Sequence, residues 1–161
     1  MITLATKSVD DTRSLAAEVA ALAAPGDLIV LAGDLGTGKT AFAQGFARGL
    51  GVDEPVTSPA FVLVRTYEGR LPLVHLDVYR LDHMQELVDL GISELLDEGA
   101  VTLVEWGDAV TPALPADFLE VRLETPEGPP DDRLLTIRSV GPAWPPRADG
   151  LRHALARWTV T

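Results

Sequence analysis

A glycine-rich segment in the first third of the chain carries the residue types that point most directly to chemistry. It runs from Gly33 to Thr40 with the sequence GDLGTGKT, and it fits the pattern G-x-x-x-x-G-K-[ST]. Glycines let the backbone adopt positive φ angles and bring several N–H groups close to the oxygens of a polyphosphate. Lys39 can reach the β- and γ-phosphates, and the Thr40 hydroxyl can bind Mg²⁺. The segment therefore predicts a loop that binds the phosphates of a nucleotide.

The residues on either side of this segment supply the strand and the helix that such a loop requires. Residues 28–32, LIVLA, predict a strand that is buried on both faces. Phe42, Phe46 and Leu50 recur at every fourth position and predict a helix over 40–50. The alternative is an ordinary glycine-rich turn with an incidental lysine. Because both flanks are present, nucleotide binding is the favoured interpretation.

Two acidic residues end other apolar strands and could complete the site. Asp77 lies in a predicted strand over 71–80, and Glu105 lies in a predicted strand over 100–106. Either acid, taken alone, could be an exposed or salt-bridged carboxylate, but the phosphate loop upstream favours a functional role. Glu105 ends the more continuous apolar run, so we expect it on a central strand and in the Mg²⁺ shell. We expect Asp77 on a more peripheral hairpin, where it would position the attacking water.

Two further polar residues share the strand of Asp77. His75 and Tyr79 flank it at a spacing of two, which puts all three side chains on one face of a strand. This face predicts an active-site surface, and the alternative is a solvated face of a hairpin. His75 is not expected to bind a metal, because no second histidine or cysteine lies at ligand spacing.

The remaining patterns predict an α/β domain with a mixed sheet over residues 1–141. Its other elements are strands over 2–6, 61–67, 118–124 and 133–140, a helix over about 9–24 capped by Ser8 with Asp11, and helical segments over 84–90 and 92–98. Residues 61–67 and 71–80 are expected to pair as a hairpin. The Pro-rich residues 142–161 predict a loosely held tail with one or two helical turns.

Composition narrows the class of protein. The 161 residues predict a single domain, and the absence of cysteine excludes disulfide frameworks and thiolate chemistry. No secretory signal or membrane-length apolar run is visible, so a cytoplasmic location is expected. The net charge of −11 would repel RNA phosphates, which predicts that a partner would hold any RNA. Solubility alone is an equally open explanation of this charge.

Four segments in this order resemble one known family. They are GDLGTGKT, VTSPAF, HLDVYR and VEWGD, and they are similar to motifs of the TsaE (YjeE) family of small bacterial P-loop ATPases. The resemblance spans roughly residues 1–140. It implies a P-loop NTPase-like three-layer fold with a mixed β-sheet and helices on both faces. It also implies binding of ATP or ADP with Mg²⁺, and a role in threonylcarbamoyladenosine modification of tRNA together with the partner proteins TsaD and TsaB.

The resemblance also implies roles for individual residues. Those implied to bind nucleotide are Ser8, Thr12, Gly33, Asp34, Leu35, Gly36, Thr37, Gly38, Lys39, Thr40, Ala41, Trp106 and Arg133. Those implied to hold Mg²⁺ are Thr40 and Glu105, and those implied in catalysis are Asp77, Lys39 and Glu105. Within the first set, Ser8 or Thr12 would contact the base, and Arg133 would reach the nucleotide from the last hairpin.

Three functions are compatible with these observations. The first is ATP binding with slow hydrolysis, coupled to a tRNA-modifying assembly. The second is a small-molecule kinase, which would need an acceptor pocket and usually an arginine-bearing lid. The arginines at positions 65, 70 and 80 lie near a hairpin and not in a clear lid. The third is a nucleotide-dependent binding module with negligible turnover.

Overall fold

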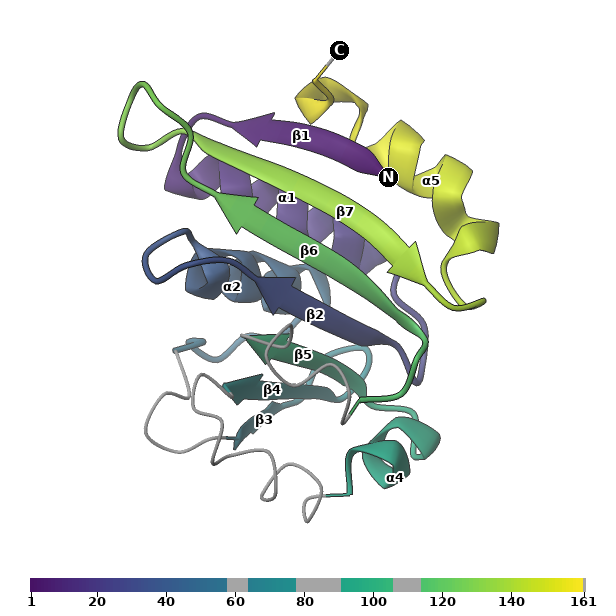
Figure 1. Ribbon diagram of the computed structural model, residues 1–161. Helices are drawn as coiled ribbons and strands as arrows, with labels where there is room; N and C mark the ends of the chain where they lie inside the picture. The colour runs from purple at the N-terminus through teal and green to yellow at the C-terminus, as the bar shows by residue number, and fades with distance from the viewer. Residues whose placement is uncertain (58–63, 78–90, 106–113, 161) are drawn as a thin grey trace.

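The computed structural model describes residues 1–57, 64–77, 91–105 and 114–160. Within these ranges, seven strands form one sheet in the order β1-β7-β6-β2-β5-β4-β3 (Figure 1). The strands are β1 (Ile2–Thr6), β2 (Leu28–Ala32), β3 (Val64–Tyr67), β4 (Leu73–Asp77), β5 (Val101–Glu105), β6 (Phe118–Glu124) and β7 (Arg133–Val140). The helices are α1 (Val9–Ala21), α2 (Lys39–Gly49), α4 (Ile92–Asp97) and α5 (Ala148–Ala154), with 3-10 turns η3 (Pro145–Arg147) and η4 (Ala156–Trp158).

The direction of the strands explains where a ligand site can form. Strands β6, β2, β5 and β4 run parallel to one another, whereas β7 and β3 run antiparallel to their neighbours. This mixed sheet confirms the predicted α/β fold class and the predicted hairpin between β3 and β4. The carboxyl ends of the four parallel strands meet at the left edge in Figure 1, where the connection from β2 to α2 emerges. Ligands of such sheets bind at this edge.

Helices α1 and α2 cover one face of the sheet and pack closely against each other. A Cβ atom added at Gly45 would lie 2.1 Å from the carbonyl oxygen of Arg13, and one added at Gly49 would lie 2.6 Å from that of Ala17. The two helices therefore approach at a distance that only glycine permits. The predicted apolar stripe of α2 is confirmed, because Phe42, Phe46 and Leu50 are fully buried in the main core. The helix begins at Lys39, one residue before the predicted start, and ends at Gly49.

Helix α1 begins where the sequence predicts. The Ser8 hydroxyl accepts the backbone N–H of Asp11 at 3.0 Å, and the Asp11 carboxylate accepts the N–H of Lys7 at 3.0 Å. The helix ends at Ala21, three residues earlier than predicted. The reason is a turn closed by Asp27, whose carboxylate accepts the N–H of Ala24 at 2.7 Å.

A smaller apolar cluster lies on the opposite face of the sheet. It contains Val30 of β2, Leu76 of β4 and Val104 of β5, and Leu96 of α4 packs against it. The sheet is thus buried on both faces at its centre, as the continuous apolar strands predict. The predicted helical segment over 84–90 lies outside the described residues. Across the parts of the chain that the structure describes, no helix has the length and apolar character needed to span a membrane.

The C-terminal residues are held firmly, so the prediction of a loosely held tail is wrong. Trp144, Leu151 and Trp158 are buried in the main core. The indole Nε1 of Trp158 donates to the Asp11 carboxylate at 2.7 Å, and the N–H of Val160 donates to a carbonyl of β1 at 2.9 Å. Burial of large aromatic side chains stabilises this segment against the domain, which the Pro-rich composition does not reveal. The predicted helical turns are present as α5 and η4.

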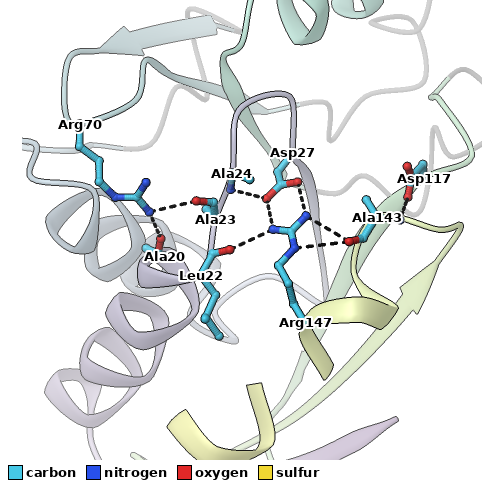
Figure 2. A network of polar contacts seen from close by, with 9 residues as sticks. All are labelled: Ala20, Leu22, Ala23, Ala24, Asp27, Arg70, Asp117, Ala143 and Arg147. Carbon is cyan, nitrogen blue, oxygen red and sulfur yellow. Dashed lines mark hydrogen bonds and ion pairs between the residues drawn. The ribbon is translucent and has the colours of Figure 1, made fainter. Parts of the chain in front are cut away.

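Arg147 of this segment makes a partly buried ion pair with Asp27 immediately before β2. Its two terminal nitrogens lie 2.5 Å and 2.8 Å from the two carboxylate oxygens (Figure 2). It also donates to the carbonyl of Leu22 at 2.9 Å, and its guanidinium lies 4.0 Å from the centre of the Trp144 ring. The tail is therefore joined to the turn between α1 and β2.

A second arginine, Arg70, binds the C-terminal end of α1. Arg70 donates to the carbonyl oxygens of Ala20 and Ala23 at 2.7 Å and 3.1 Å (Figure 2). Ala20 is in the last turn of α1, whose carbonyls lack intrahelical partners, and Ala23 lies in the turn that follows the helix. Cations also interact favourably with this end of the helix dipole. Two arginines from distant segments thus fix the position at which β2 begins.

Candidate functional site

The loop between β2 and α2 has the backbone conformation that its glycines predict. Gly33 has a φ of 142°, and a Cβ atom there would lie 2.4 Å from the carbonyl oxygen of Leu123 in β6. Gly38 has a φ of 103° and is the residue from which α2 begins. Only glycine fits at position 33 without moving the neighbouring backbone of β6. The loop is therefore packed against the end of β6 and directs the N-terminus of α2 to the same edge of the sheet.

Lys39 lies inside this loop. Its side chain is buried, and its ammonium nitrogen donates to the carbonyls of Gly33 and Asp34 at 2.7 Å and 2.8 Å. The hydroxyl of Thr37 donates to the same Asp34 carbonyl at 2.8 Å. The N-terminus of α2 adds the positive end of a helix dipole at this place. The arrangement concentrates positive charge and N–H donors, which is the electrostatic requirement for a phosphate site.

Asp77 and Glu105 lie beside each other at the carboxyl ends of adjacent parallel strands. They are partners in the β4–β5 register, and Glu105 is the partner of Leu31 in the β2–β5 register. Both carboxylates are buried. The order β2-β5-β4-β3 confirms that Glu105 is on the strand next to the loop strand and that Asp77 is on the hairpin strand further out. The side chains of registered neighbours point to the same face of the sheet. Leu31 belongs to the main core, which also contains Phe42 and Phe46 of α2. Both carboxylates therefore lie on the face of the sheet that α2 covers.

His75 is buried beside this pair of acids, so the alternative of a solvated hairpin face is wrong. Its side chain is 0% exposed, and its Nε2 lies 2.5 Å from a carboxylate oxygen of Glu105. An ionised carboxylate only accepts hydrogen bonds, so Nε2 is the ring nitrogen that donates when Glu105 is ionised. The other ring nitrogen, Nδ1, is buried and makes no hydrogen bond within the described residues. His75 therefore fixes one oxygen of Glu105 and leaves the other oxygen to other partners.

A metal at this edge would share its coordination with bound phosphate. Within the described residues, no three histidine, cysteine, aspartate or glutamate side chains are grouped so as to hold a metal ion by themselves. Mg²⁺ commonly takes one or two protein oxygens together with phosphate oxygens and water. Thr40, in the first turn of α2, and Glu105 offer oxygen donors of the required kind.

Arg133 brings the last hairpin to the phosphate loop. It is the first residue of β7, and it donates to the carbonyls of Thr37 and Gly36 at 3.1 Å and 3.3 Å. Arg133 therefore lies against the phosphate loop, and its predicted direct contact with a nucleotide stays a prediction.

The two hydroxyls predicted near the base have protein partners. Thr12 is buried, and its hydroxyl lies 2.7 Å from that of Thr6, the β1 residue paired with Arg133. The hydroxyl of Ser8 caps α1. Contact of Ser8 or Thr12 with a base stays a prediction. Trp106 and Tyr79 lie outside the described residues.

A cleft of about 530 Å³ adjoins the loop and includes residues that sequence analysis missed. It is lined by Gly33, Asp34, Leu35, Thr37, Arg122, Leu123, Glu124 and Thr125. Two other residues predicted to bind nucleotide lie on either side of Lys39 in the sequence. Leu35 is 88% exposed in the loop. Ala41 lies in the first turn of α2. Residues 122–125 follow no motif. They could be found only by knowing that β6 runs parallel to β2 and is its neighbour.

Comparison with known proteins agrees with this geometry. A family model described as "Threonylcarbamoyl adenosine biosynthesis protein TsaE" matches residues 6–133. A Bacillus subtilis protein named tRNA threonylcarbamoyladenosine biosynthesis protein TsaE is 41% identical over 137 residues, which are 84% of each chain. A protein of the same name from Treponema pallidum is 42% identical over 117 residues, covering 73% of this chain and 87% of its own.

A solved structure extends the comparison beyond the sequence. The crystal structure of YdiB from Bacillus subtilis matches with a TM-score of 0.78 and 35% identity, over 98% of this chain and 97% of that one. The range matched by the family model contains the phosphate loop, both carboxylates and Arg133. These findings confirm the resemblance seen in the sequence, and the chain belongs to the TsaE family.

Proposed function

We propose that this protein binds ATP with Mg²⁺ and hydrolyses it slowly, as a component of the assembly that forms threonylcarbamoyladenosine in tRNA. Membership of the TsaE family supports the biological role, because the relatives are named for the biosynthesis of that nucleoside. The observation that carries the nucleotide chemistry is the meeting of the phosphate loop with two buried carboxylates at one edge of the sheet.

The loop residues fit a polyphosphate. The loop at Gly33 has no room for a side chain. The ammonium group of Lys39 and the N-terminus of α2 supply positive charge in the same loop. Lys39 would exchange its contacts with loop carbonyls for contacts with phosphate oxygens. A phosphate oxygen carries negative charge that a carbonyl oxygen lacks, so the ammonium group interacts more strongly with the phosphate. The residues from Gly33 to Ala41 would hold the nucleotide through backbone N–H groups and the Lys39 and Thr40 side chains.

The residues also fit Mg²⁺, which would neutralise charge on the phosphate oxygens when bound. Thr40 and Glu105 would hold it, directly or through water. Asp77 would accept a proton or a hydrogen bond from the attacking water, because it lies one strand further out. His75 would keep the Glu105 carboxylate in one orientation.

The assembly would include TsaD and TsaB, and tRNA would be reached through them. The net charge of −11 supports this division of roles, because most non-specific affinity for nucleic acid comes from neutralising phosphates with lysine and arginine. Such an assembly would act in the cytoplasm.

The experiment measures phosphate release and modified nucleoside with the purified protein, ATP, Mg²⁺ and an activated threonylcarbamoyl donor, with and without TsaD, TsaB and tRNA. We expect slow release by the protein alone and nucleoside formation only in the complete mixture. A protein that neither binds nor hydrolyses ATP under any of these conditions would exclude the proposed chemistry. In a separate arm, tight and salt-sensitive binding of tRNA by the isolated chain would contradict the proposed role of the partners.

A further inference from the structure

The guanidinium group of Arg133 is directed at backbone carbonyl oxygens of two loops. Its Nη1 donates to the carbonyls of Pro130 and Asp132, both at 2.7 Å, in the hairpin that joins β6 and β7. Its Nε and Nη2 donate to the carbonyls of Thr37 and Gly36 in the phosphate loop. A guanidinium has five N–H donors, so these contacts engage most of them. Arg133 thus joins the last hairpin to the phosphate loop.

The contacts with the phosphate loop fix the direction of two peptide planes. The peptide bonds of the described residues are trans, so each carbonyl points opposite to the N–H of the next residue. Holding the carbonyls of Gly36 and Thr37 therefore turns the N–H groups of Thr37 and Gly38 away from Arg133. The N–H of Thr37 does point into the loop, where it lies 3.3 Å from the carbonyl of Asp34.

We propose that Arg133 is a positioning residue, which holds the phosphate loop with its N–H groups directed inward before any nucleotide binds. The proposal rests on the proposed nucleotide binding and changes the role expected for Arg133 from contact with the nucleotide to support of the loop. Donors that are already oriented bind phosphate more tightly, because binding then costs less ordering of the backbone.

The support itself is anchored in the sheet. Arg133 pairs with Thr6 in the β1–β7 ladder, so its backbone belongs to a regular strand. Asp132 is 3.3 Å from the Lys7 ammonium group, which connects the hairpin to the end of β1. To touch a phosphate, Arg133 would have to give up charge-assisted bonds to these backbone carbonyls.

The test compares Arg133→Gln and Arg133→Lys with Arg152→Gln. The last variant removes an equal charge from an exposed position on α5, where Arg152 pairs only with Asp149 within the described residues. The first readout is the NMR signals and hydrogen exchange of the Gly36, Thr37 and Gly38 amides in the nucleotide-free protein. The second readout is the dissociation constant for ATP and for ADP, and thermal unfolding checks that each variant is folded.

We expect Arg133→Gln to shift the three amide signals and to speed their exchange without nucleotide. ATP and ADP should both bind more weakly, by the same factor, on the order of tenfold, which corresponds to about 1.4 kcal/mol. Arg133→Lys should show a smaller change, because an ammonium group can reach one carbonyl but lacks the fork of a guanidinium. Arg152→Gln should match the wild type in both readouts.

If the amide signals and exchange rates of the loop are unchanged in nucleotide-free Arg133→Gln, the proposal is overturned, whatever happens to the nucleotide affinity. A loss of affinity for ATP without a loss of affinity for ADP would also overturn the proposal, and it would assign Arg133 to contact with the terminal phosphate instead. If Arg133→Gln does not fold, the same two readouts on Arg133→Lys decide. Failure of the wild type to bind either nucleotide would contradict the proposed function, whereas the amide readout would still test the support of the loop.

Discussion

Strand β2 has a buried ionic cluster at each of its ends, and the two clusters differ in how completely their groups are paired. At its start, both oxygens of Asp27 are bound by Arg147, and one of them also accepts the N–H of Ala24 (Figure 2). Beyond its end, Lys39 lies against carbonyls of its own loop, and His75 keeps one ring nitrogen without a hydrogen bond among the described residues.

The difference separates a structural cluster from a candidate site. A buried carboxylate whose two oxygens are both bound by protein groups has little remaining capacity for a ligand. A lysine that donates to carbonyls of its own loop, together with oriented carboxylates at a sheet edge, can exchange protein contacts for ligand contacts. The first cluster should therefore control stability, and the second should control nucleotide binding and turnover.

The largest effect is expected from Lys39→Ala. Loss of the ammonium group removes the charge that the loop directs at phosphate, so ATP affinity or hydrolysis should fall on the order of 100-fold or more, as for other preorganised donors. Calorimetric titration with ATP and a phosphate-release assay measure this. The same variant should remain folded, with thermal unfolding lowered only modestly by the loss of the two hydrogen bonds that the buried Lys39 makes to loop carbonyls. Normal binding and hydrolysis by this variant would remove the basis of the phosphate-site assignment.

The next effect distinguishes the two carboxylates. Asp77→Asn should lower turnover by roughly 100-fold with nearly unchanged nucleotide affinity, the pattern of an interaction made mainly in the transition state. Glu105→Gln should instead weaken the dependence of nucleotide affinity on Mg²⁺. Titration of Mg²⁺ against each variant decides between them. If Asp77→Asn loses the Mg²⁺-dependent binding and Glu105→Gln loses only turnover, the two roles are the reverse of those proposed.

The cluster at the start of β2 should show the opposite pattern. Arg147→Met leaves the buried Asp27 carboxylate without its cation and should lower the free energy of unfolding by about 2 kcal/mol, less than for a fully buried pair because Arg147 is 21% exposed. Nucleotide affinity should stay close to that of the wild type. Chemical denaturation and calorimetric titration measure the two quantities, with Arg152→Met as the surface control. A large loss of affinity with normal stability would show that the tail acts on the nucleotide site.

The sequence predicted the parts of this comparison that depend on local patterns. The phosphate loop, the strand before it and the carboxylates at 77 and 105 all follow from short motifs and apolar runs. The pairing of Asp27 with Arg147 could not be predicted, because the two residues are 120 positions apart and each resembles an ordinary polar residue of a turn. The bond between His75 and Glu105 depends on β4 and β5 being neighbours in the sheet, which no local pattern specifies.

The smallest effect is expected at His75, and it tests whether the second cluster is oriented in advance. His75→Leu removes the donor to Glu105 and should weaken Mg²⁺-dependent nucleotide affinity by roughly tenfold, the usual size of a loss of an outer-shell partner. His75→Gln keeps an N–H donor at a similar reach and should recover most of that affinity. Both variants fill the same buried space, so a merely structural role predicts equal losses in the two. In the wild type, ¹⁵N NMR of the imidazole should show the proton on Nε2 without nucleotide. A proton on Nδ1, or equal affinity losses for Leu and Gln, would contradict the orienting role.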